Sequence, residues 1–136
     1  MLHQDFLMRM ILDLVAAMQR SYTRSRGHKD PEGAAAMLEL AIGEATDIDG
    51  SVLLSLSPSS IASILQVSGT EPQLIEHLSR SLLLASDYHR EAGNEDLGRL
   101  REEQAYALAT AYGIELSPCA ISPDELEKLF EKTLLE

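Results

Sequence analysis

Apolar residues recur at helical spacing along most of this 136-residue chain. Residues three or four positions apart share one face of an α-helix, whereas residues two positions apart share one face of a strand. No stretch of the sequence shows the apolar and polar alternation of a half-buried strand. The pattern therefore predicts an all-α fold in which each amphipathic helix buries one apolar face.

Start and stop signals divide this pattern into about six helices, one of them short. Asp or Ser before Pro is typical of a helix start, because the side chain accepts hydrogen bonds from free backbone N–H groups. Gly is typical of a helix end, because it readily adopts the left-handed backbone conformation. The predicted helices run from Asp5 to about Arg24, from Pro31 to Ala45, from Pro58 to Leu65, from the segment 70–73 to Gly93, from Glu95 to Gly113 and from Pro123 to Leu134.

Two of these starts have the pattern of a capping box, in which a hydroxyl residue and a Glu or Gln three positions later cap one another's backbone N–H groups. The two boxes are Thr70 with Gln73, and Ser122 with Glu125. The first box is expected to open the long fourth helix, and the second to open the last helix.

Residues 43–50 predict the end of the second helix followed by a turn. Gly43 falls inside the apolar pattern, where Gly costs about 1 kcal/mol relative to Ala. We therefore expect the second helix to be either tightly packed at Gly43 or short. Asp47 to Gly50 is typical of a turn, with the Asp47 side chain accepting from nearby backbone donors.

Residues 86–108 predict two helices joined by Gly93 and Asn94, and so short a connection makes them antiparallel neighbours. This hairpin resembles a tetratricopeptide repeat. Small residues stand where the two helices of the repeat touch, namely at Ser86, Gly93, Gly98 and Ala105. The chain departs from the repeat at four positions. Leu82 and Glu102 stand where the repeat favours an aromatic residue, His89 stands where it favours Tyr, and Thr110 stands where Pro is common.

Residues 6–45 are similar to a second, looser repeat, since Ala34 and Ala41 have the same seven-residue spacing as Gly98 and Ala105. The stretches QDFLMRMI and LLSLSP also resemble a family of small uncharacterised bacterial helical proteins. Both resemblances imply antiparallel helical hairpins, and neither implies an activity. The alternative to a tetratricopeptide-like fold is an irregular helical bundle.

Length and composition favour one helical domain covering residues 1–136 and a cytoplasmic location. No apolar run approaches the ~20 residues that a membrane-spanning helix needs, and the start of the chain lacks the cationic and apolar segments of a secretory signal. A single cysteine, Cys119, cannot form an internal disulfide. We expect no membrane partner.

Charge is distributed unevenly along the chain, whose net charge is −11. Residues 1–30 carry a net charge of +2, from five Lys and Arg against three Asp, while residues 31–79 contain no Lys or Arg at all. An acidic surface makes nucleic acid an unlikely partner, because phosphate binding needs Lys and Arg. The positive charge of the first 30 residues is the exception that requires an explanation.

Residues 20–29 hold the one concentrated basic patch. Cations at a helix C-terminus are stabilised by about 0.3–1 kcal/mol each, which is a sufficient structural explanation. The functional alternative is a docking surface for an acidic partner, including the acidic region of a second copy. The predicted partner-binding residues are Arg20, Arg24, Arg26 and Lys29, with Met10 and Met18 as adaptable apolar contacts.

No motif indicates a catalytic, metal or cofactor site. No His has a second ligand three or four positions along a helix. The serines between residues 51 and 63 have neither a nucleophile elbow nor a neighbouring base, and no glycine-rich phosphate loop is present. We expect no cofactor and no metal, and a non-enzymatic interaction or scaffold protein that binds a protein partner or itself.

An enzyme or small-molecule-binding protein is the alternative. Its site would be assembled by folding, and the polar cluster Asp87, Tyr88 and His89 is the place for it. This alternative requires the three side chains to converge on one pocket.

Overall fold

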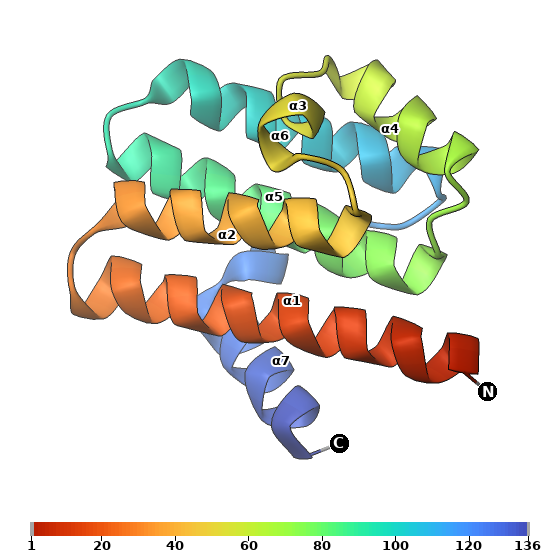
Figure 1. Ribbon diagram of the computed structural model, residues 1–136. Helices are drawn as coiled ribbons and strands as arrows, with labels where there is room; N and C mark the ends of the chain where they lie inside the picture. Colours follow the sequence, from red (N-terminus) through yellow and green to blue (C-terminus); the bar gives the residue numbers. More distant parts are fainter. Residues whose placement is uncertain (1, 136) are drawn as a thin grey trace.

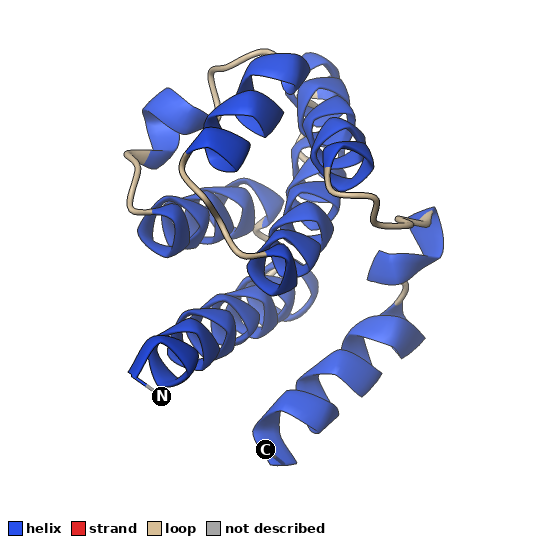
Figure 2. Cartoon of the chain, turned by 90° about the vertical axis from the view of Figure 1, so that its right-hand side faces the viewer, coloured by secondary structure: helices blue, strands red, loops and turns tan. Residues whose placement is uncertain are grey.

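The computed structural model describes residues 2–135, with side-chain surroundings for residues 5–133. Every regular element in this part of the chain is a helix, and Figure 2 shows helices joined by loops without strands. The all-α prediction of about six helices is confirmed. The elements are α1 (Leu2–Gly27), α2 (Pro31–Thr46), α3 (Gly50–Leu53), α4 (Pro58–Val67), α5 (Pro72–Glu91), α6 (Glu95–Ala111), the 3₁₀-helix η1 (Pro118–Ile121) and α7 (Pro123–Leu135).

Helix α5 lies at the centre of the bundle (Figure 1). It packs against α1, α2 and α6, while α4 packs on α6, α3 on α2, and α7 on α1. Residues 81–86 of α5 are all buried, which a helix achieves only when neighbours surround it. None of the described helices combines the length and the apolar character needed to cross a membrane.

Side-chain caps begin the helices where the sequence indicates them. Asp30 accepts a hydrogen bond from the Gly33 N–H (3.0 Å), and Ser57 accepts one from the Ser60 N–H (3.3 Å). Ser122 accepts from Glu125 N–H at 3.3 Å. These three caps are confirmed, and they could be predicted because capping depends on residues within one helical turn. Only half of the predicted box at Ser122 forms, since the Ser122 N–H donates to Cys119 O (3.0 Å).

The predicted capping box at Thr70 is wrong. Helix α5 begins at Pro72, its N-cap is Glu71, and no side-chain capping bond forms there. Thr70 belongs instead to the turn that ends α4, where its N–H donates to Leu65 O (3.1 Å) next to Gly69 at φ +72°. Thr70 is thus part of the C-terminal cap of α4, although the sequence pattern assigned it to the start of α5.

The predicted turn at 47–50 is also incomplete. Asp47 is the left-handed C-cap of α2 (φ 57°), and Asp49 caps a further one-turn helix, α3, by accepting from the Ser51 N–H at 2.9 Å. A single helical turn has no apolar repeat to reveal it, so the pattern shows only its turn-forming residues.

Gly43 packs against the backbone that follows α2. A Cβ at this position would lie 2.7 Å from Gly50 N and 3.0 Å from Ile48 O. Helix α2 continues past it to Thr46, so the expectation of tight packing is confirmed and that of a short helix is wrong. Gly43 does not have a positive φ, so its backbone conformation does not require glycine. Glycine is required because there is no room for a Cβ atom.

Gly43→Ala is expected to destabilise the protein by about 1–3 kcal/mol, because backbone atoms cannot move aside as a flexible side chain can. This cost outweighs the ~1 kcal/mol that Ala gains over Gly in helix propensity. Urea unfolding followed by circular dichroism measures the difference. Gly27→Ala is the matched control, because the nearest atom to its added Cβ is 3.9 Å away; a Gly43→Ala protein as stable as this control would contradict the prediction.

The predicted α5–α6 hairpin is present. Gly93 adopts φ +89° between the helices, and Ser86 Oγ donates a 2.6 Å hydrogen bond to Gly98 O across them. A Cβ on Gly98 would lie 3.1 Å from Ser86 O, so small residues do mark the close contact of the two helices. Membership of the tetratricopeptide repeat stays a prediction.

Candidate partner-binding groove

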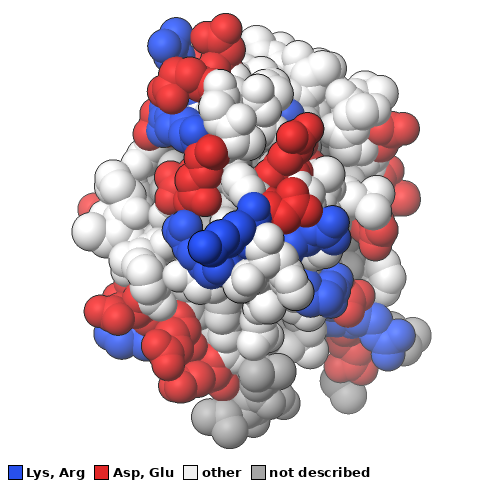
Figure 3. All heavy atoms as spheres, turned by 90° about the vertical axis from the view of Figure 1, so that its left-hand side faces the viewer, with Lys and Arg blue, Asp and Glu red and all other residues white. Residues whose placement is uncertain are grey.

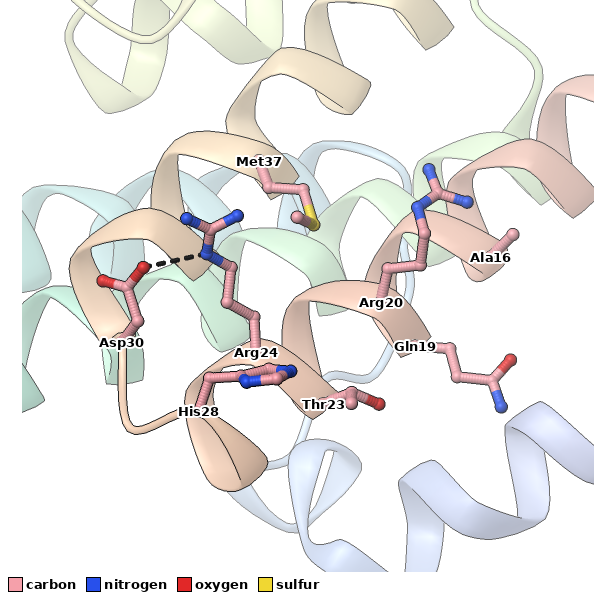
Figure 4. A pocket seen from close by; sticks show the side chains of 8 residues that line it. All are labelled: Ala16, Gln19, Arg20, Thr23, Arg24, His28, Asp30 and Met37. Atoms are coloured by element: carbon pink, nitrogen blue, oxygen red, sulfur yellow. Dashed lines mark hydrogen bonds and ion pairs between the residues drawn. The ribbon is translucent and has the colours of Figure 1, made fainter.

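A groove follows the outer face of the α1–α2 hairpin. Its main part has a volume of about 760 Å³ and is lined by Ala16, Gln19, Arg20, Thr23, Arg24, His28, Asp30 and Met37 (Figure 4). A smaller hollow of about 360 Å³ shares Ala16 and Arg20 with it and extends along α1 to Met10 and Phe6. The Phe6 side chain is 64% exposed at that end. Asp13 and Glu44 also line the smaller hollow, so the two hollows together form an open surface with cationic, anionic and apolar walls.

Two guanidinium groups stand on either side of Met37 in this groove (Figure 4). Arg24 Nε lies 2.8 Å from Asp30 Oδ2 in an exposed ion pair. The Gly33 N–H and then the Arg24 guanidinium hold the pKa of Asp30 below its usual range, so the pair is ionised at neutral pH. Arg20 is exposed and has no hydrogen bond or ion pair with any described residue. It is a free cation next to an apolar side chain.

Arg26 and Lys29 lie outside the groove. Arg26 Nη1 pairs with Glu91 Oε1 at 2.8 Å, and its guanidinium lies 5.4 Å from the centre of the Tyr22 ring. Arg26 therefore links α1 to α5, and Lys29 sits in the α1–α2 connection with φ 53°. Figure 3 shows Lys and Arg side chains grouped in the middle of this end of the molecule, bordered by Asp and Glu. The predicted basic patch is therefore divided: Arg20 and Arg24 line the groove, whereas Arg26 joins α1 to α5.

The two predicted methionine contacts separate as well. Met10 is half-buried and lines the smaller hollow. Met18 is fully buried in the core, so its assignment to a contact surface is wrong. Met18 follows Met10 by eight residues, which places it about 80° further around the helix. This rotation puts Met10 at the edge of the apolar stripe and Met18 at its centre.

Asp87, Tyr88 and His89 point to different neighbours. Tyr88 is fully buried, with its hydroxyl 3.0 Å from Ser21 Oγ of α1. His89 faces α2, and Asp87 lines a separate hollow of about 240 Å³ beside α6 and η1. Burial, and then the Glu91 carboxylate, raise the pKa of Asp87 above its usual range. Consecutive helical residues diverge by about 100°, and the structure does not bring these three side chains together.

A buried ion-pair cluster links α2, α5 and α6, and sequence reasoning missed it. Glu39 Oε2 lies 2.6 Å from His89 Nε2 and 2.7 Å from Arg101 Nε. Burial opposes ionisation of Glu39, but the hydrogen bonds from His89 and Arg101 outweigh it and leave the pKa of Glu39 below its usual range. The carboxylate is therefore ionised at neutral pH, and His89 Nε2 must donate to it.

Arg101 continues this network into the segment after α3. Its Nη1 donates to Leu54 O (2.9 Å) and to Gln104 Oε1 (3.2 Å). The Gln104 amide donates in turn to Leu54 O at 3.0 Å and Leu56 O at 2.8 Å. These backbone carbonyls lie outside regular helix and need such partners once buried. The apolar periodicity places His89 and Gln104 on the inward faces of their helices, and these two positions are the sequence signals for the network.

The hydroxyl groups of several serines between residues 51 and 63 form hydrogen bonds with neighbouring groups of the chain. Ser51 Oγ donates to Asp49, Ser55 Oγ to Val52 O, and Ser57 caps α4. Over the residues described, no Ser hydroxyl is hydrogen-bonded to a His side chain, and no three His, Cys, Asp or Glu side chains are grouped as metal ligands.

Comparisons with known proteins found no relative: no family model, no curated protein and no solved structure matches the chain. The interpretation of the groove therefore depends on its shape, charge and apolar lining. Ala16 and Met37 are the apolar residues of its main part, beside six polar ones.

Proposed function

We propose that this protein is a non-enzymatic, cytoplasmic interaction protein whose α1–α2 groove binds an acidic amphipathic helix of a partner protein. The observation that carries the proposal is the unpaired Arg20 beside Met37 in an open groove of about 760 Å³. A free cation at such a place is conspicuous in a chain with a net charge of −11.

The chemistry of the partner follows from the lining of the groove. The Arg20 guanidinium offers five donors that match a carboxylate, and Arg24 uses only its Nε in the pair with Asp30. Met37 and Met10 supply polarizable apolar contacts that adapt to varied side chains. A helix with carboxylates along one edge and apolar residues beside them satisfies both requirements.

Electrostatics also restricts the direction of approach. Arg20 and Arg24 attract carboxylates, whereas Asp13, Glu44 and the net negative charge of the chain repel them, so the carboxylates of the bound helix must lie against these two arginines. The acidic residues of a second copy are a competing occupant. Antiparallel hairpins like those of the tetratricopeptide repeat provide a rigid frame for such a surface, which supports a scaffold role.

Fluorescence anisotropy with three labelled model helices tests the proposal. The peptides share one Leu and Phe face and carry Glu, Gln or Lys on the polar edges. We expect the Glu peptide to bind most tightly and the Lys peptide least, with the preference weakening as salt is raised. Arg20→Glu should weaken binding of the Glu peptide by about tenfold, as expected for reversing one charge at the edge of an interface.

Arg99→Glu is the matched control, because Arg99 is exposed on α6 and has no ion-pair partner among the described residues. This variant should bind the Glu peptide as the unmodified protein does. Equal binding of all three peptides, or equal losses in the two variants, would contradict the groove as the site. Light scattering after size exclusion provides a second check: a dimer that Arg20→Glu abolishes would make a second copy the occupant.

A further inference from the structure

Helix α4 carries no charged side chain on any face. Charged residues make up 24% of the chain, yet residues 50–70, which contain α3 and α4, include no Asp, Glu, Lys, Arg or His. A surface helix normally places charged residues on the side opposite the core. The inner side of α4, with Ile61, Ala62 and Leu65, is buried, and the helix packs on α6 near the upper edge of the bundle in Figure 1. Its outer side therefore meets the solvent without the usual charges.

This outer side forms a hollow of about 410 Å³. The lining residues recur every three or four positions and so share one face of the helix: Leu56, Ser59, Ser60, Ser63, Ile64 and Val67. Ile64 is 39% exposed, and Val67, at 88%, is the most exposed large apolar side chain among the residues described. Serine side chains are small, so a second helix can approach the α4 backbone closely.

The absence of charge indicates which partner fits this face. Each copy of the chain has a net charge of −11, so two copies repel one another wherever charged surfaces meet. In a contact around a twofold axis the same surface of both copies meets, and a charged side chain near the axis faces an identical charge. The α4 hollow avoids this repulsion. A charged partner finds no group of opposite charge here, whereas a second copy brings a matching apolar and hydroxyl surface.

We propose that this protein forms a weak homodimer in which the outer faces of two α4 helices pack against one another around a twofold axis. Ile64 and Val67 of one copy enter the hollow of the other, which removes their exposed apolar surface from water. Helix α4 has ten residues and is about 15 Å long, so the contact lies at the low end of the ~1,200–2,000 Å² typical of stable interfaces. The dimer is therefore reversible. It is independent of the α1–α2 groove and of the function proposed for that groove.

Sedimentation equilibrium of the full chain tests the proposal at protein concentrations from about 10 to about 500 µM, a range that suits a small interface. We expect the average mass to rise from one chain toward two. The dissociation constant should fall about fivefold when NaCl is raised from about 50 to about 500 mM, because salt screens the repulsion between two acidic chains. Binding of an acidic helix to Arg20 and Arg24 weakens with salt, so the two contacts respond in opposite directions.

Val67→Glu and Met8→Glu are the matched variants, because each adds one carboxylate at an exposed apolar position and only Val67 lines the α4 hollow. Val67→Glu should weaken the dimer by about tenfold, since it places like charges in an apolar contact. Met8→Glu should leave it unchanged, because Met8 lies on α1, on the opposite side of the bundle (Figure 1).

Three results would overturn the proposal: a monomer at every concentration, a dimer that salt weakens, or equal losses in the two variants. A dimer that Arg20→Glu abolishes would also overturn it, because the contact would then lie in the α1–α2 groove.

Discussion

Arg101→Met is expected to lower the free energy of unfolding by about 3–5 kcal/mol, because it leaves the Glu39 carboxylate without its guanidinium partner in the interior. The substitution also removes one of the two donors to Leu54 O, the Gln104 amide being the other. Helix α6 keeps its contact with the segment after α3 through the bonds from Gln104 to Leu54 O and Leu56 O. Urea unfolding followed at 222 nm measures the effect.

Arg99→Met is the control for loss of an arginine from α6, because Arg99 is exposed. Its unfolding free energy should stay within about 0.5 kcal/mol of the unmodified protein. Replacing both Glu39 and Arg101 by Met should recover part of the loss, since no unpaired charge is then buried. An Arg101→Met protein as stable as the Arg99→Met control would show that the cluster does not stabilise the fold.

Tyr88→Ala is expected to destabilise the protein by about 3–5 kcal/mol, because it empties the space of a fully buried aromatic side chain. Tyr88→Phe should cost only about 1 kcal/mol. Ser21 Oγ donates its single proton to Met18 O at 2.8 Å, so the Tyr88 hydroxyl must be the donor between them, and Phe leaves Ser21 with that backbone bond. Thermal and urea unfolding of the two variants measure both values.

The contrast between these two variants separates a core residue from a ligand-binding one. A tyrosine that binds a ligand through its hydroxyl would tolerate Ala with little loss of stability. Unfolding of Tyr88→Ala at the same denaturant concentration as Tyr88→Phe would therefore contradict the buried position of this ring and revive the cluster of Asp87, Tyr88 and His89 as a site.

The placement of the helices could be predicted because its causes are local. Capping by Asp30, Ser57 and Ser122 depends on backbone groups within one turn, and the apolar repeat depends on helix geometry alone. The errors at Thr70 and in α3 occurred where two neighbouring elements compete for the same few residues. There, the closure of one helix decides where the next begins.

The candidate sites could be predicted only in part, because their members are brought together by packing. Arg20, Arg24 and Arg26 lie within seven residues, yet the first two line a groove and the third pairs with Glu91 of α5, 65 residues away. Glu39 and Arg101 are 62 residues apart, and nothing in their local sequence indicates that they meet.

The order of residues along the chain thus specified an all-α protein, the approximate ends of its main helices and the close contact at Gly98, while at Gly43 it left tight packing and a short helix as alternatives. The tertiary structure alone decided which arginines of residues 20–26 form ion pairs with described residues, which methionine is buried and which polar side chains share the interior. The reason is that helix formation and capping involve groups a few residues apart, whereas burial and pairing depend on which faces of distant helices meet.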